Sequence, residues 1–214
     1  MIKGVIFDMD GTLLDSMPHW RTVSSGYIRS KGLVPETDLD AKLAGASLIE
    51  GSTHLRDRYL PHMTAEEILD EVGGHIVDVY AQNVPAKPGA VEALRGLKAK
   101  GVKIALATAS ERRHSDPAFI RLGVFDCFDG LYTCQQAGHG KTDPAVFLLA
   151  AREMGLAPHE VAVVEDAPYA LKTARAAGFL TVAVPDPTAD WDEAQAIAHH
   201  SLASLKDWEV MLTW

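Results

Sequence analysis

Short apolar runs that alternate with helix-like segments are the feature that most constrains how this chain can fold. Five runs have the length and composition of buried strands, at residues 2–7, 102–107, 130–133, 161–164 and 180–184. Segments with helical spacing of apolar residues lie between the later runs, at 88–100, 111–122, 143–154 and 168–177. Because parallel strands connected by helices form right-handed βαβ units, this pattern predicts a parallel sheet covered by helices.

One long stretch interrupts the alternation. Residues 16–87 contain no convincing strand and have the character of successive helices, at 20–31, 38–43, 49–59 and 64–82. Thr64 and Glu67 form the capping-box pattern of a helix N-terminus. We therefore expect an α/β fold: a three-layer, Rossmann-like parallel sheet core from residues 1–15 and 88–214, with an α-helical domain, residues 16–87, inserted into it. The tail from residue 190 is expected to be helical.

Composition and charge exclude several classes of protein. Hydrophobic residues make up 47% and charged residues 23% of the 214 residues, which is ordinary for a folded soluble domain. The formal net charge of -9 repels polyanions, so we expect neither nucleic-acid nor anionic-membrane binding. No apolar run approaches ~20 residues and no signal peptide is visible, so we expect a cytoplasmic location without a membrane span. Cys127 and Cys134 form no CxxC pair and are expected to be reduced thiols.

Polar residues stand at the carboxyl ends of three expected strands. The first strand leads into an acidic turn, the second into hydroxyl-bearing residues, and the fourth into a pair of acids. In chain order, the residues that follow or end these strands are Asp8, Asp10, Gly11, Thr12, Thr108, Ala109, Ser110, Glu165 and Asp166. Lys141 lies just before the helix that leads into the fourth strand. Since open parallel sheets bind ligands beyond the carboxyl ends of their strands, we expect these segments to converge.

Carboxylates gathered in this way would repel one another, and each would have a raised pKa. A Mg²⁺ ion removes that penalty, because it prefers carboxylates together with phosphate oxygens of a substrate. With Lys141 beside it, such a site attracts a phosphate group. One carboxylate could then attack phosphorus, and a second, two residues later, could act as acid and base. Gly11 permits a tight turn whose backbone N–H groups can hold phosphate oxygens.

Four motifs carry a resemblance to a known family. Residues 7–16, Phe-Asp-Met-Asp-Gly-Thr-Leu-Leu-Asp-Ser, resemble the opening motif of haloacid dehalogenase-like phosphatases. Thr108 closes a strand like their second motif, Lys141 stands in a segment like the third, and Glu165 with Asp166 resembles the fourth. The motifs follow in the same order, and the resemblance covers residues 2–184. The chain is most similar to the β-phosphoglucomutase-like and phosphatase subgroup with a helical cap.

This resemblance implies a role for each matching residue. Asp8 is the expected nucleophile, Asp10 the general acid and base, and Thr108 a hydrogen-bond donor to the transferred phosphoryl group. Lys141 is expected to orient Asp8. The magnesium ligands implied are Asp8, Asp10 through its backbone carbonyl, Glu165 and Asp166. The residues expected to contact substrate are Gly11, Thr12, His19, Thr108, Ala109 and Ser110. The helical insert resembles the family's cap, which closes over the site.

We therefore expect a magnesium-dependent phosphatase, in monomeric form, that hydrolyses a small phosphorylated metabolite, with a sugar phosphate as the leading candidate. The alternative is a sugar phosphomutase of the β-phosphoglucomutase type. In that enzyme the segment corresponding to residues 44–48 supplies a lysine and an arginine, where this chain has Ala44 and Leu48. Thr12 also replaces the mutase's valine. Dehalogenases and phosphonate-cleaving relatives lack an acid at the position of Asp10.

A catalytically idle binding module on the same fold is the hypothesis from another class, since fold does not fix function. Every motif residue is present, which favours an enzyme. Arg112, Arg113 and His114 follow Ser110 closely, and we interpret them as a solvated helix face. Arg56 and Arg58 in the insert are interpreted in the same way.

Overall fold

The computed structural model describes residues 2–43 and 48–214, which form two compact units. The first unit comprises residues 1–15 and 85–214, and the second comprises residues 16–84. The sequence places this boundary after residue 87, three residues later. Residues 85–87 belong to the first unit because they are bonded to it. The backbone N–H of Asp15 donates to the Pro85 carbonyl at 2.9 Å, and that of Lys87 donates to the Leu13 carbonyl at 2.9 Å.

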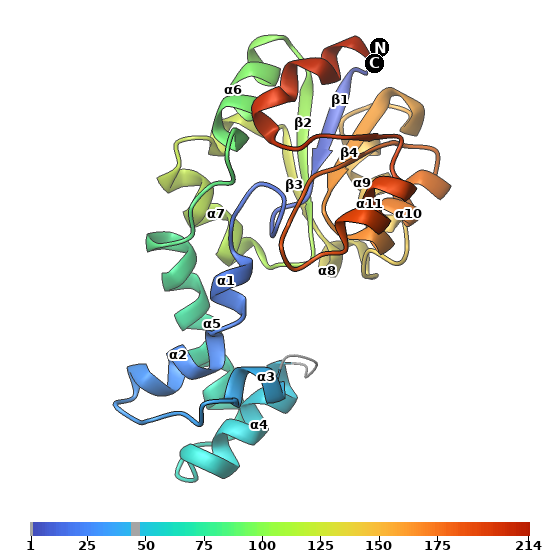
Figure 1. The fold of residues 1–214 in the computed structure, drawn as a ribbon. Coiled ribbons are helices and arrows are strands. Elements are labelled where there is room, and N and C mark those ends of the chain that lie inside the picture. The colour runs from blue at the N-terminus through green and yellow to red at the C-terminus, as the bar shows by residue number, and fades with distance from the viewer. Residues whose placement is uncertain (1, 44–47) are drawn as a thin grey trace. The chain divides into compact units, whose positions relative to one another are not determined.

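A six-stranded sheet forms the centre of the first unit (Figure 1). Its strands lie in the order β3-β2-β1-β4-β5-β6, and every neighbouring pair is parallel. Their bounds are β1 Gly4–Phe7, β2 Lys103–Thr108, β3 Gly130–Thr133, β4 Val161–Glu165, β5 Leu180–Ala183 and β6 His200–Ser201. The five expected strands are confirmed, and β1 lies inside the sheet, paired with β2 on one side and with β4 on the other.

The sixth strand corrects the expectation of a wholly helical tail. β6 pairs with β5 through Val182 and Ala183, and it lies between α11 (Trp191–Ile197) and the 3-10 segment η3 (Leu205–Thr213). A strand of two residues is too short to show the alternation of apolar and polar side chains that identifies longer strands.

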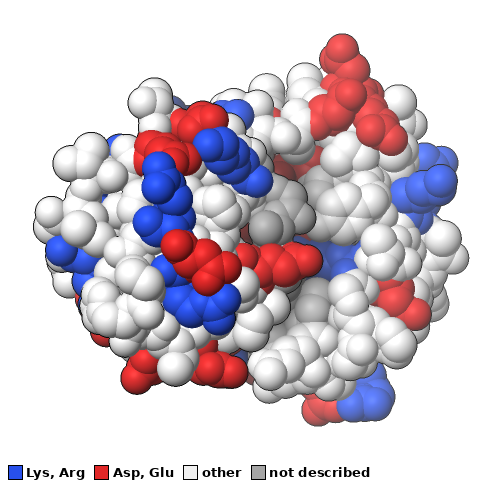
Figure 2. All heavy atoms as spheres, turned by 90° about the horizontal axis from the view of Figure 1, so that it is seen from below, with Lys and Arg blue, Asp and Glu red and all other residues white. Residues whose placement is uncertain are grey.

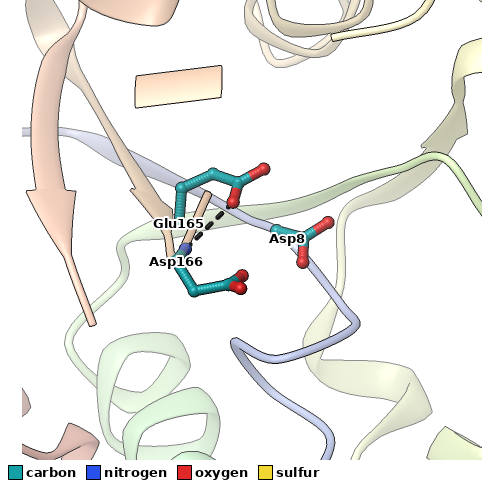
Figure 3. Close-up of side chains that lie close together, drawn as sticks. All are labelled: Asp8, Glu165 and Asp166. Carbon is teal, nitrogen blue, oxygen red and sulfur yellow. Dashed lines mark hydrogen bonds between the residues drawn. The ribbon is translucent and has the colours of Figure 1, made fainter. Parts of the chain in front are cut away.

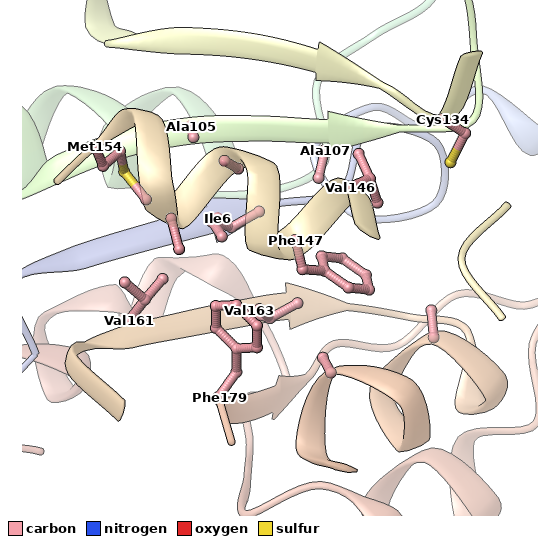
Figure 4. Packing of buried hydrophobic residues seen from close by; sticks show 14 residues of the cluster. Ile6, Ala105, Ala107, Cys134, Val146, Phe147, Met154, Val161, Val163 and Phe179 are labelled. Atoms are coloured by element: carbon pink, nitrogen blue, oxygen red, sulfur yellow. The ribbon is translucent and has the colours of Figure 1, made fainter. Parts of the chain in front are cut away.

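One face of the sheet packs against α9 (Ala145–Glu153) and α10 (Pro168–Ala176) (Figure 4). Ile6 from β1 meets Val146 and Phe147 from α9, and all three side chains are fully buried. Since side chains alternate along a strand, Val5 and Phe7 face the opposite side. Helix α6 (Ala90–Ala99) packs against β2, and η3 packs against α6.

The remaining elements of the first unit connect the strands. They are α7 (Arg112–Arg121), α8 (Cys134–Ala137), and the 3-10 turns η1 (Phe125–Cys127) and η2 (Pro158–Glu160). Helices on a parallel sheet give the expected three-layer α/β architecture. None of the helices in the described part of the chain combines the length and apolar character that crossing a bilayer requires.

Every described element of the second unit is a helix, as the sequence predicts. The helices are α1 (Met17–Trp20), α2 (Val23–Ser30), α3 (Leu39–Leu43), α4 (Leu48–Tyr59) and α5 (Ala65–Gln82). The capping box of α5 is present: the N–H of Glu67 donates to Thr64 Oγ1 at 3.2 Å, and the N–H of Thr64 donates to a carboxylate oxygen of Glu67 at 2.7 Å.

Acidic and basic side chains stand beside one another on the face of the molecule seen in Figure 2. In the helical unit, Glu36 is paired with both Arg58, at 2.6 Å, and Lys42, at 2.8 Å. The side chain of Arg58 is 60% exposed, so its interpretation as a solvated residue is confirmed.

Candidate active site

The carboxyl ends of β1 and β4 lie side by side at the centre of the sheet. Asp8 directly follows β1, Glu165 is the last residue of β4, and Asp166 comes next. The backbone N–H of Asp8 donates to the Val164 carbonyl at 3.0 Å, which continues the ladder past the end of β1. The order of the strands diverges on either side of β1, and open α/β sheets bind ligands at such a point.

Three buried carboxylates meet at this position (Figure 3). Asp8, Glu165 and Asp166 each offer one oxygen, and these oxygens lie within 4.8 Å of one another. Figure 3 shows the Asp166 side chain extending toward Asp8 from the end of β4. Glu165 is held in place by its own neighbours, since its Oε2 accepts the N–H groups of Asp166 at 2.9 Å and Ala167 at 3.0 Å. The cluster is therefore built on two rigid strand ends.

Lys141 supplies a buried positive charge to the cluster. It lies in the connection between α8 and α9, and its ammonium group is bonded to Asp8 Oδ1 and, at 2.6 Å, to Glu165 Oε1. Burial works to lower the pKa of Lys141, but the charges of Asp8 and Glu165 outweigh it and raise that pKa well above its usual value. Lys141 is therefore an ammonium ion whenever the cluster is ionised.

The carboxylates remain under electrostatic strain despite Lys141. Burial raises the pKa of Asp8 well above its ordinary value, and the charges of Glu165 and Asp166 add to this while Lys141 opposes it. Burial and the charge of Glu165 likewise raise the pKa of Asp166 to about 7. Three carboxylates and one ammonium leave two negative charges unbalanced in a buried place. That donor set suits a hard divalent metal ion, which binds oxygen ligands and would balance the charge.

The raised pKa of Asp166 predicts how pH acts on metal-free protein. The folded state holds the Asp166 proton up to about pH 7, whereas the unfolded chain releases it near the ordinary aspartate pKa of 3.8. The folded state therefore binds more protons between these values, and stability contributed by this site falls as pH rises through that window. We expect the free energy of unfolding of wild type, relative to Asp166→Asn, to decrease from pH 4 to pH 7 in EDTA. A difference that stays constant across that range would contradict the assignment.

Gly11 and Thr12 hold Asp166 from the other side. Thr12 is fully buried, and its hydroxyl donates to Asp166 Oδ1 at 2.9 Å. Gly11 has a φ of 86°, in the left-handed region that favours glycine. A Cβ at this position would lie 2.6 Å from Asp166 Oδ2, so the missing side chain makes room for the carboxylate. The Gly-Thr pair at positions 11 and 12 is thus explained by the geometry of Asp166.

Replacing Gly11 with alanine is expected to weaken the fold and to disturb the carboxylate cluster that suits a divalent ion. The left-handed backbone alone costs about 1–2 kcal/mol with a side chain present. The new Cβ would also displace Asp166. Gly101→Ala is the matched control, because Gly101 has a φ of 75° with nothing within 4 Å of the added Cβ. Both variants should lose stability in urea, but only Gly11→Ala should lose the increase in melting temperature on adding Mg²⁺. Equal behaviour would refute the role of Gly11.

Asp10 and Thr108 are connected through Ser110. The Ser110 hydroxyl donates to Asp10 Oδ2 at 2.6 Å, and the Ser110 N–H donates to Thr108 Oγ1 at 3.0 Å. Thr108 ends β2 and is almost fully buried, whereas Asp10 is partly exposed. The structure thus brings Asp10 of the opening motif next to the end of β2.

The other expected site residues have different surroundings. Ala109 is exposed beside the end of β2, and His19 belongs to the helical unit, so contacts of both with substrate stay predictions. The comparison with the mutase depends on residues 44–48. Residues 44–47 and the side chain of Leu48 lie outside the described part of the chain.

His114 differs from its interpretation as part of a solvated helix face. It is 3% exposed instead of solvated, because α7 turns it inward on the same face as Ala118, four residues later. Arg113 is exposed as expected, with 44% of its side-chain surface accessible, whereas Arg112 is half-buried, with 41% accessible, and pairs with Asp116.

Asp186 is a neighbour of the cluster that the sequence reasoning missed. It lies three residues past the end of β5, its side chain is fully buried, and it pairs with Lys87 Nζ at 2.9 Å. Its charge adds to the rise in the pKa of Asp166. The same search for acids beyond strand ends would have found it. With Thr12 and Trp191, the pair lines a mostly apolar cavity of about 520 Å³.

The sequence as a whole matches a known family. The model of the haloacid dehalogenase-like hydrolases matches residues 2–178. The chain belongs to that family. Relatives of this haloacid dehalogenase-like hydrolase are named as phosphatases, in agreement with the expected class, the phosphoric monoester hydrolases. Hexitol phosphatase A of Escherichia coli strain K12 is 32% identical over 206 residues, covering 92% of this chain and 90% of that protein. The phosphorylated carbohydrates phosphatase of Thermotoga maritima is 30% identical, covering 83% and 82%.

Solved structures share the architecture of this hydrolase. A provisionally named beta-phosphoglucomutase from Thermotoga maritima superposes with a TM-score of 0.85 at 27% identity, covering 99% of both chains. CbbY from Rhodobacter sphaeroides, solved in complex with phosphate, superposes with a TM-score of 0.77 at 20% identity, covering 97% of this chain and 96% of that one. The second likeness shows the fold alone.

Proposed function

We propose that this hydrolase is a magnesium-dependent phosphatase that acts on a small phosphorylated carbohydrate through phosphorylated Asp8. The observation that carries the proposal is the buried cluster in which Lys141 bridges Asp8 and Glu165 beside Asp166. Asp8, Glu165 and Asp166, with the backbone carbonyl of Asp10, are the proposed ligands of Mg²⁺. When bound, the ion supplies positive charge that offsets the carboxylates and the phosphate group.

Asp8 is the proposed nucleophile of the first step. Its carboxylate oxygen forms a bond to phosphorus while the bond from phosphorus to the substrate's alkoxide oxygen breaks. Lys141 favours this step because its ammonium group opposes the rise in the pKa of Asp8 that burial causes, and because it fixes the orientation of the carboxylate. Thr108, whose hydroxyl oxygen already accepts the Ser110 N–H, has a hydroxyl hydrogen to donate to a phosphoryl oxygen.

Asp10 is the proposed acid and base. In the first step it gives a proton to the departing alkoxide, which leaves as an alcohol. In the second step it takes a proton from a water molecule, whose oxygen bonds to phosphorus as the bond to Asp8 breaks. The products are inorganic phosphate and regenerated Asp8. Because Asp10 stands two residues after Asp8 on one tight turn, both groups can reach the same phosphoryl group.

A carbohydrate phosphate is the proposed substrate class because two relatives at 30% identity or more act, by name, on hexitol phosphates and on phosphorylated carbohydrates. The test is phosphate release from hexitol, hexose and glycerol phosphates, with phosphoglycolate and nucleotides for comparison. We expect the highest kcat/KM with a polyol or sugar phosphate and loss of activity in EDTA. Release from none of the esters, or rates that EDTA leaves unchanged, would refute the proposal. Isomerisation of a bisphosphorylated hexose would show the mutase instead.

We further propose that the enzyme works as a cytoplasmic monomer. Cys127 and Cys134 are free thiols, and burial raises the pKa of both, so they are poorly reactive. Light scattering on purified protein should give the mass of one chain, 23.1 kDa. A larger mass would contradict the monomer without affecting the catalytic proposal.

A further inference from the structure

Ser110 makes a short side-chain hydrogen bond to Asp10. Its hydroxyl donates to Asp10 Oδ2 at 2.6 Å across 100 positions of the chain. This distance is typical of a hydroxyl that donates to a carboxylate, which is stronger than a hydrogen bond between neutral groups. Ser110 is itself fixed, because its N–H donates to the hydroxyl of Thr108 at the end of β2. The contact therefore ties the Asp10 side chain to the sheet.

The backbone around Asp10 is already rigid. The N–H of Gly11 donates to the Leu14 carbonyl at 2.9 Å, and the N–H groups of Leu13 and Leu14 both donate to the Met9 carbonyl. Only the side-chain torsions of Asp10 are left to vary, and the side chain is partly exposed. Ser110 acts on these torsions directly, because it holds one of the two carboxyl oxygens.

Asp10 also lies near the inner face of α7. Burial lowers the pKa of His114, and the charges of Glu111 and Asp10 oppose that effect. Asp10 is therefore close enough to α7 to interact with a buried side chain there. Ser110 and α7 both belong to the segment that follows β2, and Ser110 is the residue of this segment that holds the carboxyl group of Asp10.

We propose that Ser110 is a positioning residue for the acid and base Asp10 and does not serve mainly to bind substrate. This inference rests on the proposed function of Asp10. With Ser110 donating to Oδ2, the transferable proton is carried by Oδ1. In the first step that proton passes from Oδ1 to the departing alkoxide oxygen, and in the second a water proton returns to Oδ1. The Ser110 hydroxyl keeps its own proton throughout.

Two substrates that differ in their need for an acid test the proposal. A hexitol phosphate has an alkoxide leaving group that requires a proton, whereas the nitrophenolate of p-nitrophenyl phosphate departs without one. We expect Ser110→Ala to lower kcat/KM for the hexitol phosphate by roughly 10²-fold, the scale of a misplaced catalytic group. For p-nitrophenyl phosphate the same variant should lower kcat/KM by less than about threefold. Hydrolysis of the phosphorylated enzyme should slow with both substrates, because Asp10 is the base in that step.

The controls separate positioning from folding and from substrate binding. Ser110→Thr keeps the hydroxyl and should recover most of the lost activity. Ser201→Ala, at an exposed serine on β6, should match wild type. A similar loss of kcat/KM with both substrates, a raised KM for both, or no loss at all would overturn the role of Ser110. If wild type released no phosphate from either substrate with Mg²⁺, the proposed function itself would fail.

Discussion

Replacing Asp8 with asparagine is expected to lower phosphate release by roughly 10⁴-fold or more, on the scale seen when a catalytic nucleophile is removed. The amide cannot attack phosphorus, and no other described carboxylate stands one residue past β1. The fold should survive, because the variant removes a buried charge whose pKa is already raised by burial and by its acidic neighbours. The melting temperature in EDTA should therefore equal or exceed that of wild type.

The measurement is single-turnover kinetics with a substrate labelled in its phosphate group. Wild type should carry the label on the protein, and Asp8→Asn should carry none. Asp126→Asn is the matched control, since it makes the same change at an exposed acid in η1. Label retained on the variant, or turnover within tenfold of wild type, would mean that another residue accepts the phosphoryl group.

The sequence predicts the parts of the site that follow from strand ends. Asp8 directly follows one buried apolar run and Asp166 stands two residues after another, and a parallel sheet carries such positions to one edge. Lys141 belongs to no strand end, so only the charge argument and the family resemblance connect it with Asp8. The structure brings all three side chains together because Lys141 enters the cluster from the connection between α8 and α9.

The sequence does not predict contacts that depend on the direction of a side chain. The hydroxyl of Ser110 has equal access, by sequence, to substrate or to Asp10, and only the positions of β1 and β2 decide between them. By sequence, His114 follows two arginines and is expected on the solvated face of a helix, yet the rotation of α7 turns it inward. Asp186 looks like a turn residue beside two prolines, and its burial depends on Lys87, 99 positions earlier. Such pairings arise from tertiary packing that local patterns do not encode.

Replacing Lys141 with methionine is expected to have the largest effect on stability. Methionine has a similar length and no charge, so the cavity stays filled beside Phe147, whose ring centroid lies 5.9 Å from the ammonium group. Asp8 and Glu165 would each lose the cation that bridges them. Removing one member of a buried ion pair costs about 3–5 kcal/mol, because the remaining charge is left uncompensated. Activity should be lost as well, since the pKa of Asp8 would rise further without the ammonium group that opposes the effect of burial.

The dependence of that loss on pH distinguishes it from damaged packing. Acidic conditions protonate the carboxylates that Lys141 neutralises, so the difference in unfolding free energy between wild type and Lys141→Met should be largest near pH 8 and smaller near pH 5. Lys172→Met, at an exposed lysine on α10, should change stability by no more than about 0.5 kcal/mol. The double variant Lys141→Met with Asp8→Asn should be more stable than Lys141→Met alone, because it has one fewer uncompensated charge. A loss that is equal at both pH values, or that Asp8→Asn does not reduce, would show that Lys141 contributes through packing instead of charge.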